Sequence, residues 1–466
     1  MKKACVLMFA VAAAATLNAA TINQVIVRQQ WPWSIKIKVE YSLSGVDASH
    51  PVDIAVSTYN GDDPLPSTNL RAAIEGDLYG ITEEFGEFYI DPVVAYGTEK
   101  IGMTKFKVKL AVSDSPAGYD YGEVLYKIFC LTNNTCTDVT RKDILNNKYG
   151  AYETDFSKIG EGFNTTLDDV LIWTDVTNNP AYKDTHLVMR KVKAKDVLWT
   201  IGSPSGESGR QGSSGKSEDQ HQVKLTQDYF IGVFEITQKQ YARLEFTNNS
   251  QFKADDDHPY RPVEKVPYST VRGSRDQAYN GEKICWPTNS FKHAVYSTSF
   301  CGKMRSKFSN VIFDLPTEAQ WEFACRAGTT GSVYSGKTTD LNSAVSELGW
   351  CSVNSTQASS GRYTSDVGLK KPNAFGLYDM LGNVMEMCLN FSDNDITDGK
   401  SDPLVNPDGG YHPNASFARQ LRGGCASEQA VTCRSAWRAP ANWGDTGTSY
   451  YFGFRLVCPD GESWED

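Results

Sequence analysis

Residues 370–387, with the sequence KKPNAFGLYDMLGNVMEM, constrain the fold of this chain more than any other stretch. Turn-forming residues recur within it, among them Pro372, Gly376 and Gly382, and large apolar side chains stand between them. Glycine adopts backbone angles that other residues resist, and proline and asparagine favour turns. The pattern predicts an irregular, tightly packed segment with exposed carbonyl oxygens rather than a regular helix or strand.

The chain of 466 residues is long enough for two domains, each with a substantial hydrophobic core. Hydrophobic residues make up 40% of it and charged residues 22%, as is typical of a globular protein. The formal net charge is −10, and the basic residues form no cluster. An acidic chain of this kind is not expected to bind nucleic acid or an anionic membrane.

The first 20 residues have the pattern of a secretory signal peptide. Lys2 and Lys3 precede an apolar run over residues 4–17, and the small residues Ala19 and Ala20 follow it. The run is short for an anchoring helix, and no stop-transfer charges come after it. The sequence therefore predicts cleavage near Ala20 and a secreted or periplasmic protein.

Ten of the 11 cysteines lie beyond residue 20, and most thiols pair as disulfides in an oxidising compartment. Cys130 and Cys136 flank the polar turn LTNNT between two β-like runs, so a local disulfide that closes a hairpin is expected. A zinc site is disfavoured because no CxxC spacing occurs and the six histidines are scattered.

Residues 21–140 are predicted to form an all-β, sandwich-like accessory domain. Between residues 21 and 115, apolar and polar residues alternate with a period of two, and Gly, Pro and Asp separate the runs. Residues 122–131 could add one more strand to this domain. The clearest predicted strands cover residues 22–29, 34–42, 52–58 and 105–112.

A polar connector over residues 141–185 separates this domain from the rest of the chain. The loop over 203–217 ends in GKS, but a phosphate-binding loop would need glycine where Arg210 stands, so a flexible surface loop is the better interpretation. Two helices are predicted beyond it. One is capped by Thr237, and the other covers residues 316–324 with acidic residues in its first turn.

Seven motifs follow one another through the second half of the chain. They are VLWTIGSP at 197–204, FIGVFEITQKQ at 230–240, LPTEAQWEFACRAG at 315–328, NAFGLYDMLGNVMEM at 373–387, RGG at 422–424, CRSAWR at 433–438 and GFRL at 453–456. On these motifs, the second half of the chain resembles the formylglycine-generating enzyme, or sulfatase-modifying factor, family. The resemblance implies an α+β, C-type-lectin-like domain of low regular secondary structure over residues 186–466.

The resemblance implies an oxidase that converts a sulfatase cysteine to formylglycine, using oxygen and a copper(I) ion held by two thiolates. Copper(I) is soft, prefers sulfur and accepts a two-coordinate site. The two cysteines of the family lie five residues apart after the RGG motif, and the matching positions here are Glu428 and Cys433. One thiolate is therefore missing, and a carboxylate is a poor substitute.

Cys425 replaces the serine that follows the glycines in the family motif. Cys425 and Cys433 are eight residues apart, so they could form a disulfide or, in a rearranged loop, bind a metal ion. Arg434 and Arg438 are expected to brace these loops through ion pairs, with contact to a substrate as the alternative.

The resemblance also implies a calcium site within residues 370–387. In the relatives, an acid or amide, two backbone carbonyls and a glutamate bind the ion, and the matching residues are Asp379, Gly382, Val384 and Glu386. The alternative is that Asp379 caps a turn and Glu386 is solvated. The acidic stretch at 393–399 lacks the EF-hand spacing and is interpreted as a solvated loop.

Family position further suggests a disulfide between Cys301 and Cys458. In the relatives, the second cysteine lies two residues closer to the GFR motif. Two residues along a strand keep their side chains on the same face, so the pairing would survive this shift.

Two classes of function remain open. The first is an exported oxidoreductase that acts on a protein or peptide substrate such as a sulfatase. The second is a non-catalytic ligand- or protein-binding module on the same scaffold, with recognition loops at 426–432 and 439–451. An iron-dependent sulfoxide synthase would need a histidine-rich helical partner domain, which the β-rich first half does not supply.

Overall fold

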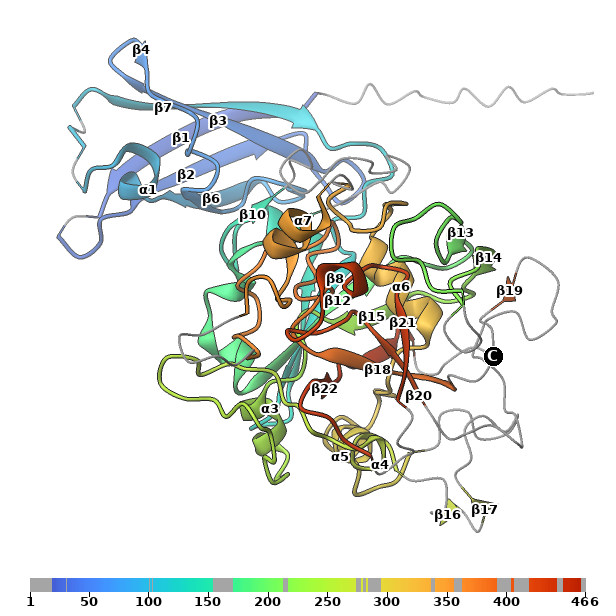
Figure 1. Ribbon diagram of the computed structural model, residues 1–466. Helices are drawn as coiled ribbons and strands as arrows, with labels where there is room; N and C mark the ends of the chain where they lie inside the picture. Colours follow the sequence, from blue (N-terminus) through green and yellow to red (C-terminus); the bar gives the residue numbers. More distant parts are fainter. Residues whose placement is uncertain are drawn as a thin grey trace, which may run out of the picture. The chain divides into compact units, whose positions relative to one another are not determined.

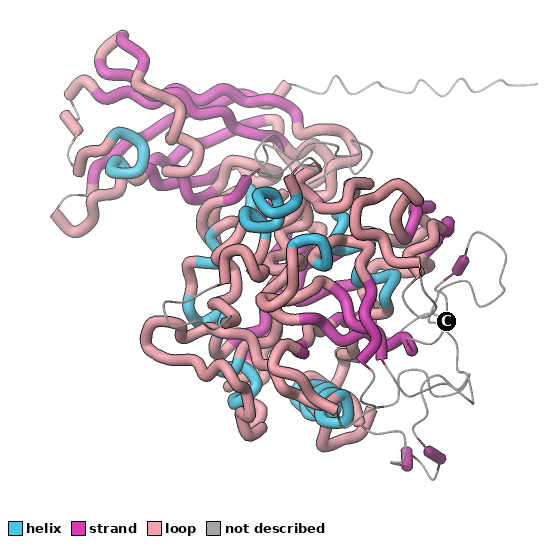
Figure 2. Tube along the Cα trace, in the orientation of Figure 1, coloured by secondary structure: helices cyan, strands magenta, loops and turns pink. Residues whose placement is uncertain are grey.

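The computed structural model covers both halves of the chain (Figures 1 and 2). The predicted leader up to residue 18, Cys285, the acidic stretch 393–399 and part of the loop 439–451 lie outside the described residues. Within the described part, no helix is both long and apolar enough to cross a membrane. The described residues are 19–30, 32–99, 101–102, 104–153, 171–212, 217–273, 278–279, 282–283, 295–336, 340–355, 363–391, 404–405, 419–441 and 447–461.

The chain divides into two compact units. The first consists of Met1–Gly122 with Lys142–Gly150, and the second of Glu123–Arg141 with Ala151–Asp466. The second unit thus begins well before residue 186, where the sequence analysis placed its start. The hairpin that precedes the predicted connector belongs to the second unit.

The assignment of residues 122–131 to the first domain is wrong. β8 (Val124–Cys130) pairs with β9 (Cys136–Thr140) on one side and antiparallel with β12 (His186–Val192) on the other. β8 is largely buried and reads as an almost continuous apolar run, VLYKIFC. Such a run identifies a buried strand but not its partner.

The first unit contains two antiparallel sheets that share one hydrophobic core. The strand order is β1-β2-β6-β5 in one sheet and β4-β3-β7 in the other. All four predicted strands are present. Burial alternates along β2, so every second side chain of this strand lies in the core. The elements are β1 (Thr21–Gln29), β2 (Ile37–Ser44), β3 (Val52–Asn60), β4 (Asp63–Pro64), β5 (Ile74–Gly76), β6 (Phe85–Ile90), α1 (Pro92–Tyr96) and β7 (Phe106–Asp114), and α2 (Arg141–Leu145) lies at the division between the units.

The second unit is built around a five-stranded sheet in the order β23-β15-β12-β8-β9, and loops make up most of the rest (Figure 2). A second sheet has the order β21-β20-β18-β22. The remaining strands are β10 (Tyr152–Glu153), β11 (Ile172–Trp173), β13 (Leu198–Ile201), β14 (His221–Lys224), β15 (Tyr229–Gly232), β16 (Ala278–Tyr279), β17 (Glu282–Lys283), β18 (Met385–Phe391), β19 (Leu404–Val405), β20 (Arg419–Arg422), β21 (Arg438–Ala441), β22 (Phe452–Gly453) and β23 (Val457–Pro459). The helices are α3 (Gln238–Arg243), α4 (Tyr268–Val271), α5 (Phe300–Lys307), α6 (Glu318–Arg326) and α7 (Leu341–Leu348), with short 3₁₀ turns at Asp175–Thr177, Pro180–Lys183 and Ala430–Thr432.

Both predicted helices are confirmed as α3 and α6, and each begins with a capping box. In α6, the Thr317 hydroxyl accepts from the Gln320 amide, and the Gln320 side chain accepts from the Thr317 amide. The helix packs beside β18 and β20 (Figure 1) and buries Trp321 completely. α6 thereby joins the irregular segment to the core.

The two predicted disulfides are absent, because all four cysteines are free. Cys136 lies opposite Phe129 in the β8–β9 pair, so the neighbouring Cys130 points to the other face of the sheet. Cys458 lies with its Sγ 3.9 Å from the Sδ of Met189. The opposite faces of Cys130 and Cys136 explain why the first bridge does not form.

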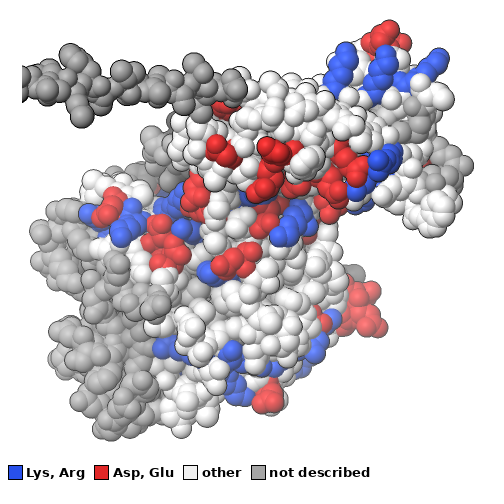
Figure 3. All heavy atoms as spheres, turned by 180° about the vertical axis from the view of Figure 1, so that it is seen from behind, with Lys and Arg blue, Asp and Glu red and all other residues white. Residues whose placement is uncertain are grey.

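Charged side chains of both signs are interspersed on the face drawn in Figure 3. Many of the surface ion pairs are between exposed groups, such as Lys107 with Asp62 at 2.9 Å. Exposed pairs of this kind contribute at most about 1 kcal/mol each. The strong charge interactions of this protein are the buried ones in the second unit.

Candidate functional site

The segment over residues 370–387 is irregular, as its glycines predict. Residues 371–384 form no helix or strand, with a turn at 374–375 and bends around Gly382, and β18 begins only at Met385. Gly382 has a φ of +87°, and a Cβ there would lie 2.1 Å from the carbonyl oxygen of Trp350. Any side chain at this position would clash with backbone, so the turn requires glycine.

A buried ion pair closes the end of this segment. The Arg455 guanidinium donates to both oxygens of Glu386 at 2.7–2.8 Å, and the Trp321 indole donates to the same carboxylate at 2.7 Å. Glu386 is 1% exposed and Arg455 is fully buried. The carboxylate of Glu386 is therefore already saturated by protein donors.

Two further buried carboxyl groups, Asp379 and Glu235, lie near this pair, and the pKa of each is raised. Burial raises the pKa of Asp379 to about 6, against the opposing hydrogen bond from the Gly368 amide. Burial and the charges of Asp379 and Glu386 raise the pKa of Glu235 well above its ordinary value. Glu235 accepts from the Asn383 side chain at 2.6 Å, whereas Oδ1 of Asp379 is buried without a hydrogen-bond partner.

The thiols beyond the RGG motif are enclosed. Cys425 and Cys433 are both fully buried, and the Cys433 Sγ lies 3.9 Å from the Cys425 carbonyl oxygen. Burial raises the pKa of Cys425 to about 12 and that of Cys433 well above its ordinary value. Glu428 lies in the turn between them, where its amide donates to the Cys425 carbonyl at 3.0 Å.

The arginines of this region brace the loops, as predicted. Arg434 donates to both oxygens of Glu218 at 2.8 Å, and Arg438 donates to both oxygens of Glu318 at 2.7 and 2.8 Å. All four groups are at most 1% exposed. Because each guanidinium is paired inside the protein, none of these groups is placed to contact a substrate.

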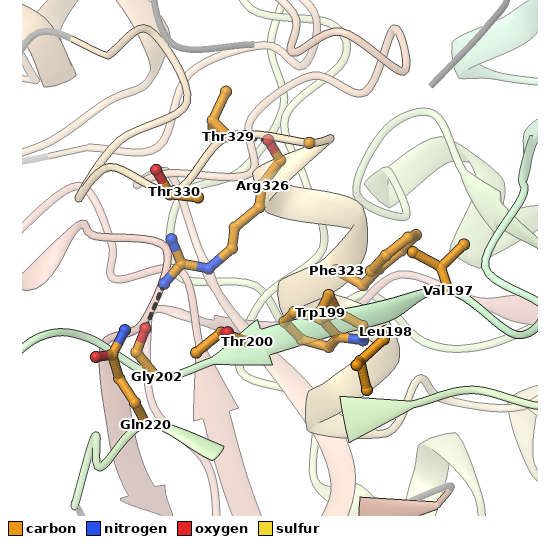
Figure 4. Close-up of a pocket in the computed structure, with 11 residues that line it drawn as sticks. Val197, Leu198, Trp199, Thr200, Gly202, Gln220, Phe323, Arg326, Thr329 and Thr330 are labelled. Carbon is orange, nitrogen blue, oxygen red and sulfur yellow. Dashed lines mark hydrogen bonds between the residues drawn. The ribbon is translucent and has the colours of Figure 1, made fainter. Parts of the chain in front are cut away.

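A pocket of about 320 Å³ lies between β13 and the C-terminal end of α6 (Figure 4). Its apolar side chains gather at one end and its hydroxyl and amide side chains at the other (Figure 4). Pockets that bind small ligands usually combine an apolar wall with a few polar groups. The lining residues are Val197, Leu198, Trp199, Thr200, Gly202, Gln220, Phe323, Arg326, Gly328, Thr329 and Thr330.

Arg326 holds the floor of this pocket in place. Its Nε donates to Glu322 at 2.8 Å, and its Nη2 donates to the carbonyl of Gly202 at 2.7 Å (Figure 4). Glu322 also accepts from the Gly202 amide at 2.9 Å. The ion pair of Arg326 and Glu322 thus joins the end of β13 to α6. The two opposite charges neutralise each other in the wall of the pocket.

Comparison with known proteins decides the family. The family described as sulfatase-modifying factor enzyme 1-like domain matches residues 188–459, which is more than half of the chain. The chain belongs to this family. The matched residues include every element that forms the pocket and the irregular segment.

Relatives of this sulfatase-modifying-factor family member carry different names. Serine/threonine-protein kinase pkn1 of Chlamydia pneumoniae is 29% identical over 64% of this chain and 43% of its own length. The chaperone protein LppX of Paenibacillus barcinonensis is 27% identical over 39% of this chain and 69% of its own. The formylglycine-generating enzyme of Mycobacterium tuberculosis is 34% identical over 31% of this chain and 50% of its own. The chain thus spans less than half the length of the kinase relative.

Two solved structures are also similar. Treponema denticola variable protein 1 has a TM-score of 0.42 and 23% identity, covering 59% of this chain and 95% of that one. PvdO from Pseudomonas aeruginosa has a TM-score of 0.40 and 20% identity, covering 58% and 94%.

The copper positions of the sulfatase-modifying factor family do not fit copper(I) here. Glu428 offers a carboxylate oxygen at the position where the family has a cysteine sulfur, and Cys433 is fully buried. Among the described residues, no group of three or more His, Cys, Asp or Glu side chains is arranged to hold a metal ion. The donor set at these two positions lacks the pair of thiolates that copper(I) prefers.

The calcium positions of the family fit only in part. Asp379 has a buried oxygen with no partner, which suits a hard cation. Glu386 is held by Arg455 and Trp321, so it could reach an ion only by giving up these bonds. The calcium site therefore stays a prediction.

Neither Glu235 nor the pocket residue Trp199 was predicted from the sequence as a site residue. Glu235 interrupts the apolar run FIGVFEIT, and a carboxylate inside such a run must find buried partners. This interruption of the apolar run could have identified Glu235 as a buried polar residue. Trp199 gave no such signal, because an apolar residue in a strand is ordinarily part of the core.

Proposed function

We propose that this chain is a non-catalytic binding protein of the sulfatase-modifying factor family. The observation that carries the proposal is the pair of positions where the family holds copper: Glu428 replaces one thiolate, and Cys433 is fully buried. A copper(I) oxidase of the formylglycine-generating type would need both sulfur ligands and an open path for the substrate thiol.

The test is a comparison with the formylglycine-generating enzyme of Mycobacterium tuberculosis. Both proteins are reduced, titrated with copper(I) and incubated with oxygen and a sulfatase peptide that contains cysteine. Mass spectrometry of the peptide should show formylglycine only with the mycobacterial enzyme. Conversion by this chain that disappears in Cys433→Ser would overturn the proposal.

A formylglycine-generating oxidase with a rearranged ligand pair is the second candidate. The close approach of the Cys433 Sγ to the Cys425 carbonyl, 3.9 Å, places the two cysteines side by side and favours it. In that case Cys425→Ser should abolish copper(I) binding as fully as Cys433→Ser does, while Glu428→Gln should leave it unchanged. Equal binding by all three variants excludes the pair.

We also propose calcium binding at Asp379, supported by its unpartnered buried oxygen. Calcium should raise the melting temperature of the protein relative to a sample in EDTA, because a ligand that binds only the folded state stabilises it. Asp379→Ala should remove this difference. Identical melting temperatures with calcium and with EDTA in the wild type would rule out the site.

Export is supported by the leader-like sequence of the first 20 residues. Expression of the full chain in a bacterial host should yield a mature protein that begins near Thr21 and is released with the periplasmic fraction. Mass spectrometry of the N-terminus measures this. An intact Met1 or a cytoplasmic product would contradict it.

A further inference from the structure

We propose that the pocket between β13 and α6 binds a neutral saccharide ring. This inference rests on the proposed binding function and names its ligand class. The pocket measures about 320 Å³, near the lower end of the volumes usual for ligand sites, so it suits one or two sugar rings.

The charges in the pocket wall disfavour an ionic ligand. Among the described residues that line the pocket, Arg326 is the only one with an ionisable side chain. Its guanidinium is held by Glu322, whose pKa is lowered by Arg326 and Arg422 although burial opposes this. An anion would compete with Glu322 for Arg326, and the described wall offers no carboxylate to a cation.

The apolar end presents aromatic rings. Trp199 and Phe323 meet edge to face, with their ring centroids 5.3 Å apart at an interplanar angle of 65°. Leu198 beside them is 59% exposed. Phe323 is only 6% exposed, so the half-buried Trp199 is the ring that offers a surface on which the C–H face of a sugar ring can pack by dispersion.

The polar end presents uncharged donors and acceptors. Gln220 and Thr330 are exposed, and neither side chain has a partner within the described chain. The Thr200 hydroxyl accepts from Gln222 at 2.7 Å and keeps its own hydrogen to donate. An apolar peptide side chain bound here would displace water from these groups without giving them a hydrogen-bond partner, whereas the hydroxyls of a sugar would form hydrogen bonds with them.

The test is saturation-transfer difference NMR of the full chain with cellobiose and N,N′-diacetylchitobiose. Transfer should reach the C–H protons of the sugar. Trp199→Ala and Gln220→Ala should each weaken binding by about tenfold or more. Gln220 is exposed, so Gln220→Ala should fold normally. It therefore tests the pocket even if Trp199→Ala fails to fold. Trp33→Ala is the matched control, because Trp33 is 91% exposed in the other unit and should leave binding unchanged.

N-acetyl-phenylalaninamide and N-acetyl-leucinamide serve as probes for a peptide ligand. The inference is overturned if neither saccharide binds, if binding survives both pocket replacements, or if only the amides bind there. If neither saccharide binds and the sulfatase peptide is not oxidised, only this inference is rejected. Formation of formylglycine rejects the proposed function, whichever probe binds.

Discussion

At the scale of single residues, Glu264 should make stability depend on pH. Its side chain is buried with Oε2 unpartnered, and burial raises its pKa from 4.5 to about 7. The folded state binds the Glu264 proton more tightly than the unfolded chain does. The free energy of unfolding therefore has its full contribution from this protonation below pH 4.5 and loses it as the pH rises through 7. Glu264→Gln keeps the acceptor for the Phe252 amide, so it should stabilise the protein by about 1–3 kcal/mol at pH 8 and by little at pH 5. Urea unfolding at both pH values measures the difference.

Glu245→Gln is the matched control, since its side chain is 89% exposed. An equal effect of both replacements at pH 8 would contradict a role of burial. The unpartnered oxygen of Glu264 could not be foreseen from the sequence, because the pattern RPVEKV does not say which residues surround the carboxylate. The same holds for Asp379: its place at a turn was predictable, but its missing hydrogen bond was not.

At the scale of elements, the buried pair between Glu318 in α6 and Arg438 in β21 should hold the second sheet to the helix. Glu318→Gln leaves the guanidinium buried without its counter-charge and should destabilise the protein by about 3–5 kcal/mol. Replacement of both residues by Met should recover most of this loss, since no isolated charge remains. Thr317→Ala, which removes only the cap, should cost about 1 kcal/mol. Denaturant midpoints of the four proteins check the order, and a double replacement as unstable as Glu318→Gln would refute the explanation.

Local signals account for which elements the sequence predicted. Period-two alternation gave the strands of the first unit, and Thr caps gave α3 and α6. The irregular backbone of residues 370–384 followed from their glycines. Pairing between distant strands is not a local property, so β8 was assigned to the wrong unit. The disulfide predicted across the β8–β9 turn failed for a related reason, because register decides which face each cysteine occupies.

At the scale of the whole molecule, the division into units predicts which fragments fold. A fragment that starts at residue 123 keeps β8, whereas one that starts at residue 186 loses it and exposes the edge of β12. The shorter fragment also loses Tyr126 and Trp173, which are at most 1% exposed and lie edge to face at 5.5 Å. Their removal alone forfeits about 3–6 kcal/mol of hydrophobic stabilisation, which is a large part of the stability of a typical domain.

The fragment over residues 123–466 should therefore be soluble and melt cooperatively by circular dichroism. The fragment over residues 186–466 should aggregate, because β12 would present an unpaired and largely buried strand to other chains. A third fragment that starts at residue 141 separates the two causes: it restores Trp173 but not β8. If it behaves like the longest fragment, the strand pairing is dispensable, and the boundary near residue 140 suggested by the sequence would be the better description of the molecule.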